Sequence, residues 1–236
     1  MRNATRFGCA FLLSLLAACG GGGGATGTLL SIPFDPANFS GHAIDNPLLP
    51  LVPRTRFVYE GTTSAGFEHV VVEVTTTTKV ILGVTCVEVH DTAFIDGALV
   101  EDTLDWYAQD ATGNVWYFGE DTKQMSGGVV VGTVGSWQAG LAGALPGVVM
   151  LAAPVLGVSY AQEDAPGVAN DRARIVALAD PVTVPWGAFP ACLHTEDDSL
   201  LTPGVVEDKF YAPGVGLVLE IDDEGARVEL ILVEIF

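Results

Sequence analysis

The sequence predicts an all-β fold: an antiparallel meander that forms a curved sheet, a half-barrel or a barrel, with one long Gly/Pro-rich loop. Three observations support this class. Charged residues make up only 17% of the 236-residue chain, below the usual level of about 25%. Valine-rich runs alternate apolar and polar residues with a period of two. Turns are abundant, with 28 glycines and 13 prolines.

Residues 1–18 have the composition of an export signal. Arg2 and Arg6 make its start positive, and the apolar run that ends at Ala18 is too short to span a bilayer. Its last residues and the next, Leu-Ala-Ala-Cys at 16–19, resemble the bacterial lipobox. The resemblance implies cleavage before Cys19, a diacylglycerol on its sulfur and acylation (palmitate or a similar chain) of the new amine. The alternative is an ordinary secretory signal with a chance cysteine.

A glycine-rich tether, residues 19–30, follows the signal. It contains a formal G-x-G-x-x-G, but no strand precedes it and no helix follows, so it does not predict a nucleotide site. Because Gly20 rather than aspartate follows Cys19, the lipobox resemblance implies sorting to the outer membrane in a diderm bacterium. We therefore expect an exported protein that is held at the cell envelope by lipid.

Residues 31–236 are expected to form a single β domain. An irregular lead-in, 34–57, is rich in proline and turn residues and is expected to lie on the domain. The alternating runs that follow predict strands at 56–60, 68–76, 80–92, 99–109, 115–120, 129–134, 157–163, 174–178, 191–196, 205–212, 217–221 and 227–235. The apolar segment 136–157, broken by Gly and Pro, predicts a long loop, and Leu141–Leu156 could cover a site as a lid.

The aromatic segment 104–118 predicts a hairpin whose register is open. If Thr112-Gly113 is a two-residue turn, Asp105 faces Glu120, and two facing carboxylates suggest a divalent cation or an acid/base pair. If Gly113 takes the left-handed position of a three-residue loop, the pairing slips by one residue. Trp106 then faces Phe118, Tyr107 faces Tyr117, Asp105 faces Gly119 and Glu101 faces Lys123.

We favour the second register because it pairs aromatic rings and one set of opposite charges. It makes the aromatic residues mainly structural and leaves the carboxylates mostly solvated. Both strand faces carry aromatic rings, so part of one face should still line a core, a cavity or a groove. The expected lining of an apolar ligand site is Trp106, Tyr107, Trp116 and Phe118.

Two cysteines remain after export, Cys86 and Cys192, and an exported chain with one pair predicts a disulfide. Alternation places His90 with Cys86, and His194 with Cys192, on one face of their strands. The bridge would therefore gather two histidines and two glutamates, a donor set that suits zinc or copper. The candidate metal residues are Asp105, Glu120, His90 and His194. No cofactor is expected otherwise, and a divalent cation is the one candidate.

The charge and the missing motifs exclude several functions. The formal net charge is −19, and it becomes more negative when Arg2 and Arg6 are removed, which disfavours nucleic acid as a partner. The sequence holds no G-x-S-x-G, H-E-x-x-H, C-x-x-C or EF-hand spacing. Twenty-nine acids could supply a hydrolytic pair, but none is singled out. We therefore expect a binding protein rather than an enzyme.

Two segments near the ends of the domain, NPLLPLVPRTRFVYEG (46–61) and DKFYAPGVGLVLE (208–220), resemble parts of uncharacterised bacterial exported proteins and lipoproteins. In those proteins an opening strand and a closing YAPGVGLV hairpin bracket a curved antiparallel sheet, and glycine is usual where this chain has Arg54. The fold is also loosely similar to periplasmic half-barrels that carry lipoprotein acyl chains.

These observations favour a lipid-anchored exported module whose partners are the membrane, through its anchor, and an apolar small molecule or another envelope protein. One alternative is a metal- or calcium-dependent module or hydrolase that uses the acids near the 101–121 hairpin. The other is a structural envelope lipoprotein without a small ligand.

Overall fold

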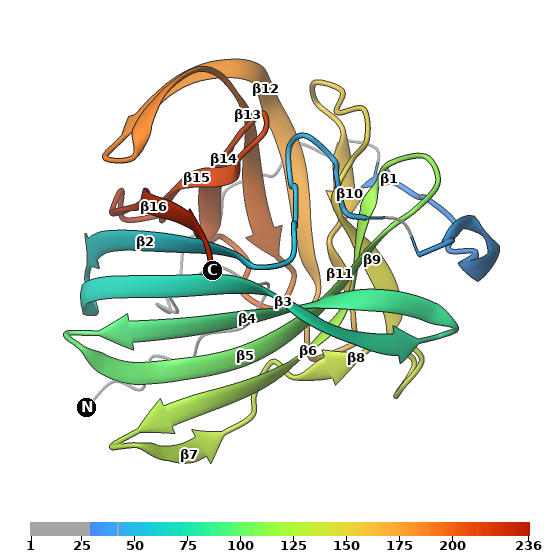
Figure 1. The fold of residues 1–236 in the computed structure, drawn as a ribbon, viewed down its shortest axis with the longest axis horizontal. Coiled ribbons are helices and arrows are strands. Elements are labelled where there is room, and N and C mark those ends of the chain that lie inside the picture. Colours follow the sequence, from blue (N-terminus) through green and yellow to red (C-terminus); the bar gives the residue numbers. More distant parts are fainter. Residues whose placement is uncertain (1–28, 42) are drawn as a thin grey trace.

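The computed structural model describes residues 29–41 and 43–236, and these form one large, strongly curved sheet (Figure 1). Its first arm is a meander in which each strand pairs antiparallel with the next. The strands of this arm are β2 (Thr55–Thr63), β3 (Gly66–Ile81), β4 (Val84–Ile95), β5 (Ala98–Gln109) and β6 (Val115–Ser126).

The second arm is another antiparallel meander, and it joins the first through its last strand. Its strands are β12 (Asp171–Val184), β13 (Gly187–Ser199), β14 (Val206–Ala212), β15 (Gly216–Ile221) and β16 (Arg227–Ile235). Because β16 pairs with β2, the C-terminal strand lies at the middle of the sheet rather than at an edge (Figure 1).

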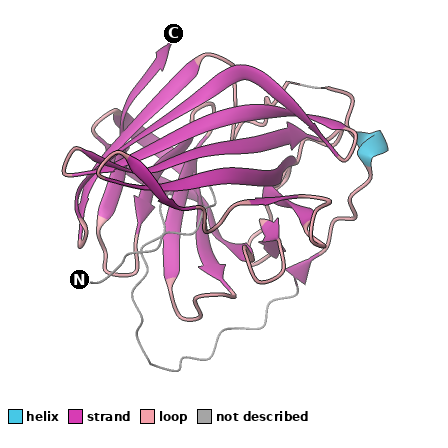
Figure 2. Cartoon of the chain, turned by 90° about the horizontal axis from the view of Figure 1, so that it is seen from below, coloured by secondary structure: helices cyan, strands magenta, loops and turns pink. Residues whose placement is uncertain are grey.

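Short strands complete the two ends of the sheet. They are β1 (Leu29–Leu30), β7 (Val129–Gly132), β8 (Trp137–Gln138), β9 (Leu145–Met150), β10 (Ser159–Ala161) and β11 (Glu163–Asp164), with one 3-10 turn, η1 (Pro36–Asn38). β1 and β10 form a parallel pair. β10 also pairs with β12 at one end of the sheet, whereas β11 pairs with β9 at the other. The segment 159–164 therefore brings the two ends of the sheet together without closing a barrel. Figure 2 shows the curved sheet from below, with the helical turn η1 at its side. The predicted all-β, curved, antiparallel fold is confirmed.

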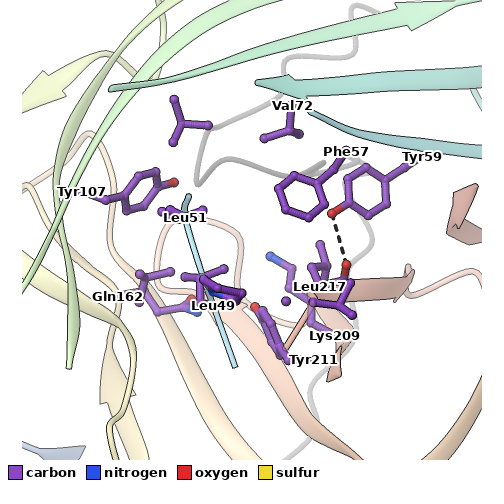
Figure 3. Close-up of a pocket in the computed structure, with 15 residues that line it drawn as sticks. Leu49, Leu51, Phe57, Tyr59, Val72, Tyr107, Gln162, Lys209, Tyr211 and Leu217 are labelled. Carbon is purple, nitrogen blue, oxygen red and sulfur yellow. Dashed lines mark hydrogen bonds between the residues drawn. The ribbon is translucent and has the colours of Figure 1, made fainter. Parts of the chain in front are cut away.

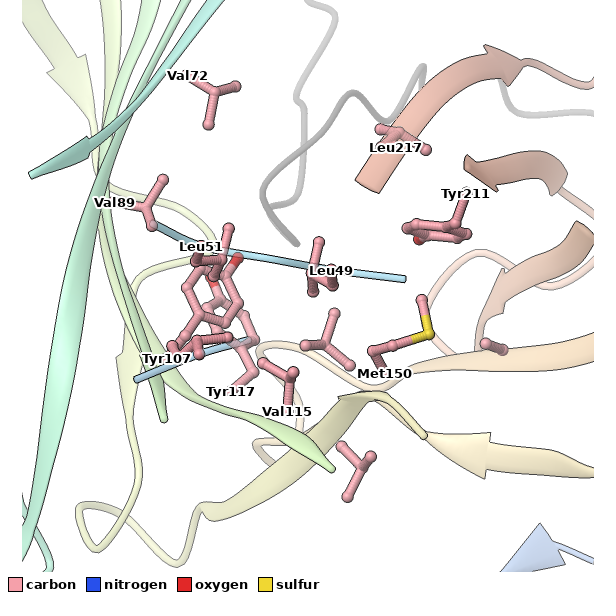
Figure 4. Packing of buried hydrophobic residues seen from close by; sticks show 14 of the residues in the cluster. Leu49, Leu51, Val72, Val89, Tyr107, Val115, Tyr117, Met150, Tyr211 and Leu217 are labelled. Atoms are coloured by element: carbon pink, nitrogen blue, oxygen red, sulfur yellow. The ribbon is translucent and has the colours of Figure 1, made fainter. Parts of the chain in front are cut away.

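The apolar core fills the concave face of the curved sheet. Val72 and Val89 point inward from the first arm, and Tyr211 and Leu217 point inward from the second (Figure 4). The lead-in does more than lie on the surface, because Leu49 and its neighbours are buried between the arms. Burial of apolar area stabilises a fold by about 25 cal/mol per Å², so this segment contributes to the stability of the domain.

A second apolar layer covers the other face of the aromatic hairpin. Phe34 and Phe39, on either side of η1, pack edge-on against Trp116 and Phe118 with ring centroids 5.7–5.9 Å apart. The Trp116 indole donates a 2.8 Å hydrogen bond to Asp110. Alternation explains this arrangement, since Trp116 and Phe118 point away from the inward-facing Tyr117.

Backbone conformation explains two departures from expectation. Arg54 has φ +70, a left-handed conformation that glycine adopts without strain, so this position would accept the glycine that the resemblance leads one to expect. The predicted strand 80–92 is right for residues 84–92, which lie in β4, but wrong at its start, because Leu82 and Gly83 have φ +51 and +82 and form a tight turn. The chain there reverses from β3 into β4, so Lys79 lies opposite Cys86.

The segment 136–157 is not one long loop. It contains β8 and β9, which pair with β6 one after the other, and it contains no helical turn. Gly147 permits this pairing, because a Cβ there would lie 2.1 Å from the Gln162 carbonyl oxygen. Alternation was hard to recognise because both faces of β9 are buried, so its residues are apolar throughout.

The concave face also carries acids, contrary to the prediction that the acids are mostly solvated. These side chains sit on inward positions of different strands, and the sheet curls around them. The buried acids are Glu68, Asp91, Asp105, Glu120, Glu163, Asp171, Asp197, Glu207 and Glu220, with Lys209 among them. The Lys209 ammonium lies 3.4 Å from Asp197 and 3.8 Å from Glu207.

Candidate functional site

Two hollows in the described part of the chain lie near the predicted site residues. The first is an apolar cavity inside the concave face, between Tyr107 on one arm and Tyr211 on the other (Figure 3). Its volume is about 40 Å³, which is room for about one water molecule. The Tyr59 hydroxyl beside it already donates to the Leu217 carbonyl at 3.1 Å. This cavity is therefore a small gap in the core rather than a ligand site.

The second hollow is a cleft of about 420 Å³ beside β6 and β8, within the range of about 300–1,000 Å³ that small-molecule sites occupy. Two indoles, two carboxyl groups, one ammonium group and small apolar residues line it. The lining residues are Lys79, Trp106, Glu120, Asp121, Ser136, Trp137, Gln138, Leu141, Ala142, Ala144, Ala165, Pro166 and Val168. We call it the Trp106–Trp137 cleft.

Trp106 forms one wall of the cleft and carries a cation on its ring. The Lys79 ammonium lies 3.2 Å from the centroid of the indole, which is the geometry of a cation–π contact. Burial lowers the Lys79 pKa, and the nearby carboxylates of Asp121 and Glu88 oppose that shift. The Trp106 indole nitrogen faces the Glu88 carboxylate at 3.5 Å.

Glu120 reaches the cleft because the hairpin combines both predicted registers. Near the turn, Tyr107 pairs with Tyr117 as the favoured register requires, and their rings stack 4.8 Å apart. A bulge then shifts the pairing, and Asp105 faces Glu120 as in the other register. The predicted pairs Asp105–Gly119 and Glu101–Lys123 are therefore wrong, since Lys123 lies opposite Asp102, whereas Trp106 lies opposite the bulge formed by Phe118 and Gly119.

Gly119 makes the bulge possible. Its φ is +123, and a Cβ at this position would lie 2.3 Å from the Trp137 carbonyl oxygen. The bulge places an extra residue in β6. Because the glycine has no Cβ, β8 can approach β6 closely at this point. Trp137 then packs edge-on against Tyr117 with centroids 5.4 Å apart.

Asp105 and Glu120 form a buried carboxyl pair joined by one hydroxyl. The Tyr117 hydroxyl lies 2.5 Å from an Asp105 oxygen and 2.9 Å from a Glu120 oxygen. Burial raises the Asp105 pKa to about 8, against the opposing effect of the Tyr117 hydrogen bond. Burial, together with Glu163 and Asp105, holds the Glu120 pKa well above its usual range. Burial therefore favours the protonated form of both carboxyl groups.

A tight loop, residues 139–144, forms the outer wall of the cleft. Its Gly140 packs so closely on Leu82 that a Cβ would lie 2.6 Å from that side chain. Ala142 has φ +50, and backbone hydrogen bonds from Gly140 to Ala144 and from Ala144 to Leu141 hold the loop. Leu141 is 59% exposed at the mouth. Of the predicted lid, Leu141–Leu156, this end alone lines the cleft.

The four predicted lining residues are divided among three environments. Trp106 lines the cleft, and Tyr107 lines the small core cavity. Trp116 and Phe118 are packed under Phe34 and Phe39. Alternation sends Tyr107 to the concave face and the other three residues to the opposite face, where different segments cover them.

Of the four predicted metal residues, Asp105 and Glu120 are brought together, but the two histidines lie apart from them and from each other. His90 lies 3.0 Å from Asp102, and His194 lies between Asp180 and Asp208 at 2.9 and 2.7 Å. Asp105 and Glu120 point to the buried concave side, whereas both histidines are partly exposed. Within residues 29–41 and 43–236, no three His, Cys, Asp or Glu side chains are arranged to hold a metal ion.

The predicted disulfide is also wrong. Cys86 and Cys192 are buried free thiols, and β14, β15, β16, β2 and β3 lie between their strands in the sheet. Each sulfur is covered locally, and burial raises the pKa of Cys86 to about 12 and that of Cys192 to about 11. These thiols are therefore poorly nucleophilic, and the His–Glu cluster that the bridge would have assembled does not form.

Two side chains that line the cleft, Lys79 and Trp137, are not among the site residues that the sequence predicts. The turn at Leu82-Gly83 places Lys79 opposite Cys86 and hence near Trp106, whereas one continuous strand over 80–92 does not. Trp137 lay in the segment interpreted as a loop. No local pattern links Trp137 to Trp106, because the sheet alone brings them together.

The predicted signal, the predicted lipidation site Cys19 and most of the predicted tether lie outside the described residues, while Leu29–Leu30 at the end of the tether form β1. The described residues contain no helix with the length and hydropathy that crossing a bilayer requires.

No protein-family model and no curated protein matches this chain. Two solved structures share part of its fold. One is a candidate exported protein with a YmcC-like fold from Bacteroides fragilis, at TM-score 0.45 and 14% identity, covering 79% of this chain and 98% of that chain. The other is a candidate lipoprotein from Parabacteroides distasonis, at TM-score 0.45 and 12% identity, covering 80% of this chain and 99% of that chain.

Proposed function

We propose that this protein is exported, anchored to the cell envelope by lipid on Cys19, and binds a small, partly apolar molecule in the Trp106–Trp137 cleft. The observation that carries the binding proposal is the cleft itself. It is about ten times larger than the core cavity, two indoles line it, and an exposed leucine stands at its mouth. Aromatic walls with a few polar groups are the usual composition of a ligand site.

The anchoring proposal rests on the amino-terminal sequence. A positive start, a short apolar run and Leu-Ala-Ala-Cys together match a lipoprotein signal. When the full chain is expressed in bacteria that are fed a clickable palmitate analogue, the protein should become labelled. The Cys19→Ser substitution should abolish both the label and the retention of the protein at the membrane. Equal labelling of the Cys19→Ser variant would exclude this anchor. Outer-membrane sorting is tested by fractionation of a diderm host.

The binding proposal is tested with a neutral apolar dye, N-phenyl-1-naphthylamine, whose fluorescence rises in an apolar site. We expect saturable binding to the mature chain at one site. Leu141→Asp should raise the Kd of the dye at least about tenfold, because it removes the contact with the leucine and puts a carboxylate at the mouth of the cleft. Tenfold corresponds to the loss of most of one leucine contact. Leu156→Asp is the matched control, since Leu156 is 61% exposed and does not line the cleft.

Neither leucine is buried, so both variants should keep the far-UV dichroism of the wild type. Dye binding that both substitutions weaken equally, or that neither weakens, would place the dye elsewhere and refute the proposed site.

One observation favours a second candidate, an acid-dependent hydrolase. A protonated carboxyl that lines a cleft can act as a general acid, and Glu120 fits this description. Turnover from a panel of aryl esters and aryl glycosides that Glu120→Gln abolishes would support catalysis. The absence of any turnover above that of Glu120→Gln would leave binding as the function.

A further inference from the structure

We infer that the Trp106–Trp137 cleft binds an organic cation, a small molecule that carries an ammonium group on an apolar body. This inference rests on the proposed function of the same cleft and names the chemical class of its ligand. Three independent features support it: an ammonium group already seated in the cleft, the charge around the cleft, and the nature of its walls.

The seated ammonium group belongs to Lys79. It lies over the ring of Trp106, 3.2 Å from the centroid, at the position where an indole attracts a cation most strongly. Lys79 is thus an internal substitute for the ligand. Its side chain is only half-buried, so it can leave the ring and regain its hydration in solvent when another cation takes its place.

The surrounding charge favours cations over anions. The chain carries a formal net charge of −19, and a field of this sign attracts cations to a cleft and repels anions. The Asp121 carboxylate lines the cleft with its side chain 49% exposed, and the Lys123 ammonium, which does not line the cleft, lies 3.5 Å from it. Among the described residues that line the cleft, Lys79 is the one basic side chain. When Lys79 swings out, the ring and the carboxylate of Asp121 are left facing the cleft.

The walls select an apolar body around the charge. Trp137 provides a second indole, and Leu141, Ala142, Ala144, Pro166 and Val168 provide aliphatic surface. A strongly hydrated inorganic cation would lose its water here without gaining enough oxygen ligands, since no three acidic or histidine side chains of the described chain converge. An alkylammonium group is weakly hydrated and satisfies both the rings and the carboxylate.

The test compares two molecules of nearly equal shape, choline and its neutral isostere 3,3-dimethyl-1-butanol, by displacement of N-phenyl-1-naphthylamine from the mature chain. We expect choline to have a Kd at least about threefold lower, the lower end of what a cation–π contact supplies. Lys79→Met removes the competing ammonium and keeps the apolar stem, so it should increase this selectivity further.

Trp106→Leu should reduce the selectivity at least about twofold, because a leucine has no π-face to attract charge, while the Asp121 carboxylate remains. Trp106→Phe provides a second variant that keeps a ring, and an intermediate selectivity is expected. Trp186→Leu is the matched control, since Trp186 is 40% exposed and does not line the cleft.

Each outcome decides between the two proposals. If the dye binds the cleft but choline and the alcohol compete equally, or the anion 3,3-dimethylbutyrate competes best, the cation inference is overturned and the binding function stands. If the dye itself does not depend on Leu141, the binding function fails as well.

Discussion

The buried acids predict an unusual dependence of stability on pH, and Asp105 is the best position at which to measure it. Its carboxyl is buried, and its pKa is raised from 3.8 to about 8. Because the folded-state pKa lies above the unfolded value, the contribution of this group to stability is complete below about pH 4. That contribution is lost progressively as the pH rises to about 8.

The size of the effect follows from the shift. One pKa unit corresponds to about 1.4 kcal/mol, so Asp105 alone should remove about 1.4 kcal/mol of unfolding free energy per pH unit, or about 3 kcal/mol between pH 5 and pH 7. Asp105→Asn keeps the shape of the protonated acid and cannot ionise. Below about pH 4 the variant should match the wild type within about 1 kcal/mol, the scale of one altered neutral hydrogen bond. Its advantage over the wild type should then grow with pH, to about 1.5 kcal/mol at pH 5 and about 4 kcal/mol at pH 7.

The assay is urea denaturation of the mature chain at pH 5, 6, 7 and 8, followed by tryptophan fluorescence. Glu224→Gln is the matched control, since that side chain is exposed in the β15–β16 turn and should shift the whole curve by no more than about 0.5 kcal/mol. A wild type whose stability rises from pH 5 to pH 8 would refute the reasoning. So would an Asp105→Asn variant that is destabilised equally at every pH.

Three further predictions follow from packing. Gly119→Ala should cost about 1–3 kcal/mol of unfolding free energy and weaken dye binding, because its Cβ would meet the Trp137 carbonyl. Urea denaturation measures the first effect and dye titration the second. An unchanged dye Kd would show that the bulge does not shape the cleft. Phe118→Ala should cost about 3–5 kcal/mol, since its ring is fully buried against Phe34 and Phe39; a loss below about 1 kcal/mol in urea would show that the lead-in does not pack there. Cys86 and Cys192 should resist Ellman's reagent until the chain unfolds, and dithiothreitol should leave the melting temperature unchanged. A lower melting temperature in dithiothreitol would show that the two cysteines form a disulfide after all.

Local pattern was sufficient for the strands whose two faces differ. Thr55–Thr63 and Arg227–Ile235 alternate, and turn residues at Pro213-Gly214 and Glu224-Gly225 separate their neighbours. Period-two alternation and glycine turns are properties of a few adjacent residues, so they can be recognised without knowing the rest of the chain. The pattern failed at β9, where both faces are buried, and at Leu82-Gly83, where a tight turn lay inside an apolar run.

The candidate site was only partly predictable. Trp106 and Glu120 were identified because aromatic and acidic residues cluster in one hairpin. Their partners were not, because Lys79 depends on an unrecognised turn and Trp137 on a short strand that pairs with the bulge at Gly119.

The fold class could be predicted from the amino-acid order alone, since alternation and turn chemistry act between neighbours along the chain. Tertiary structure decided which faces are buried, which acids keep their protons and which aromatic rings meet. Those outcomes depend on the curvature of the sheet and on a one-residue bulge in strand pairing, and no pattern of neighbouring residues predicts either.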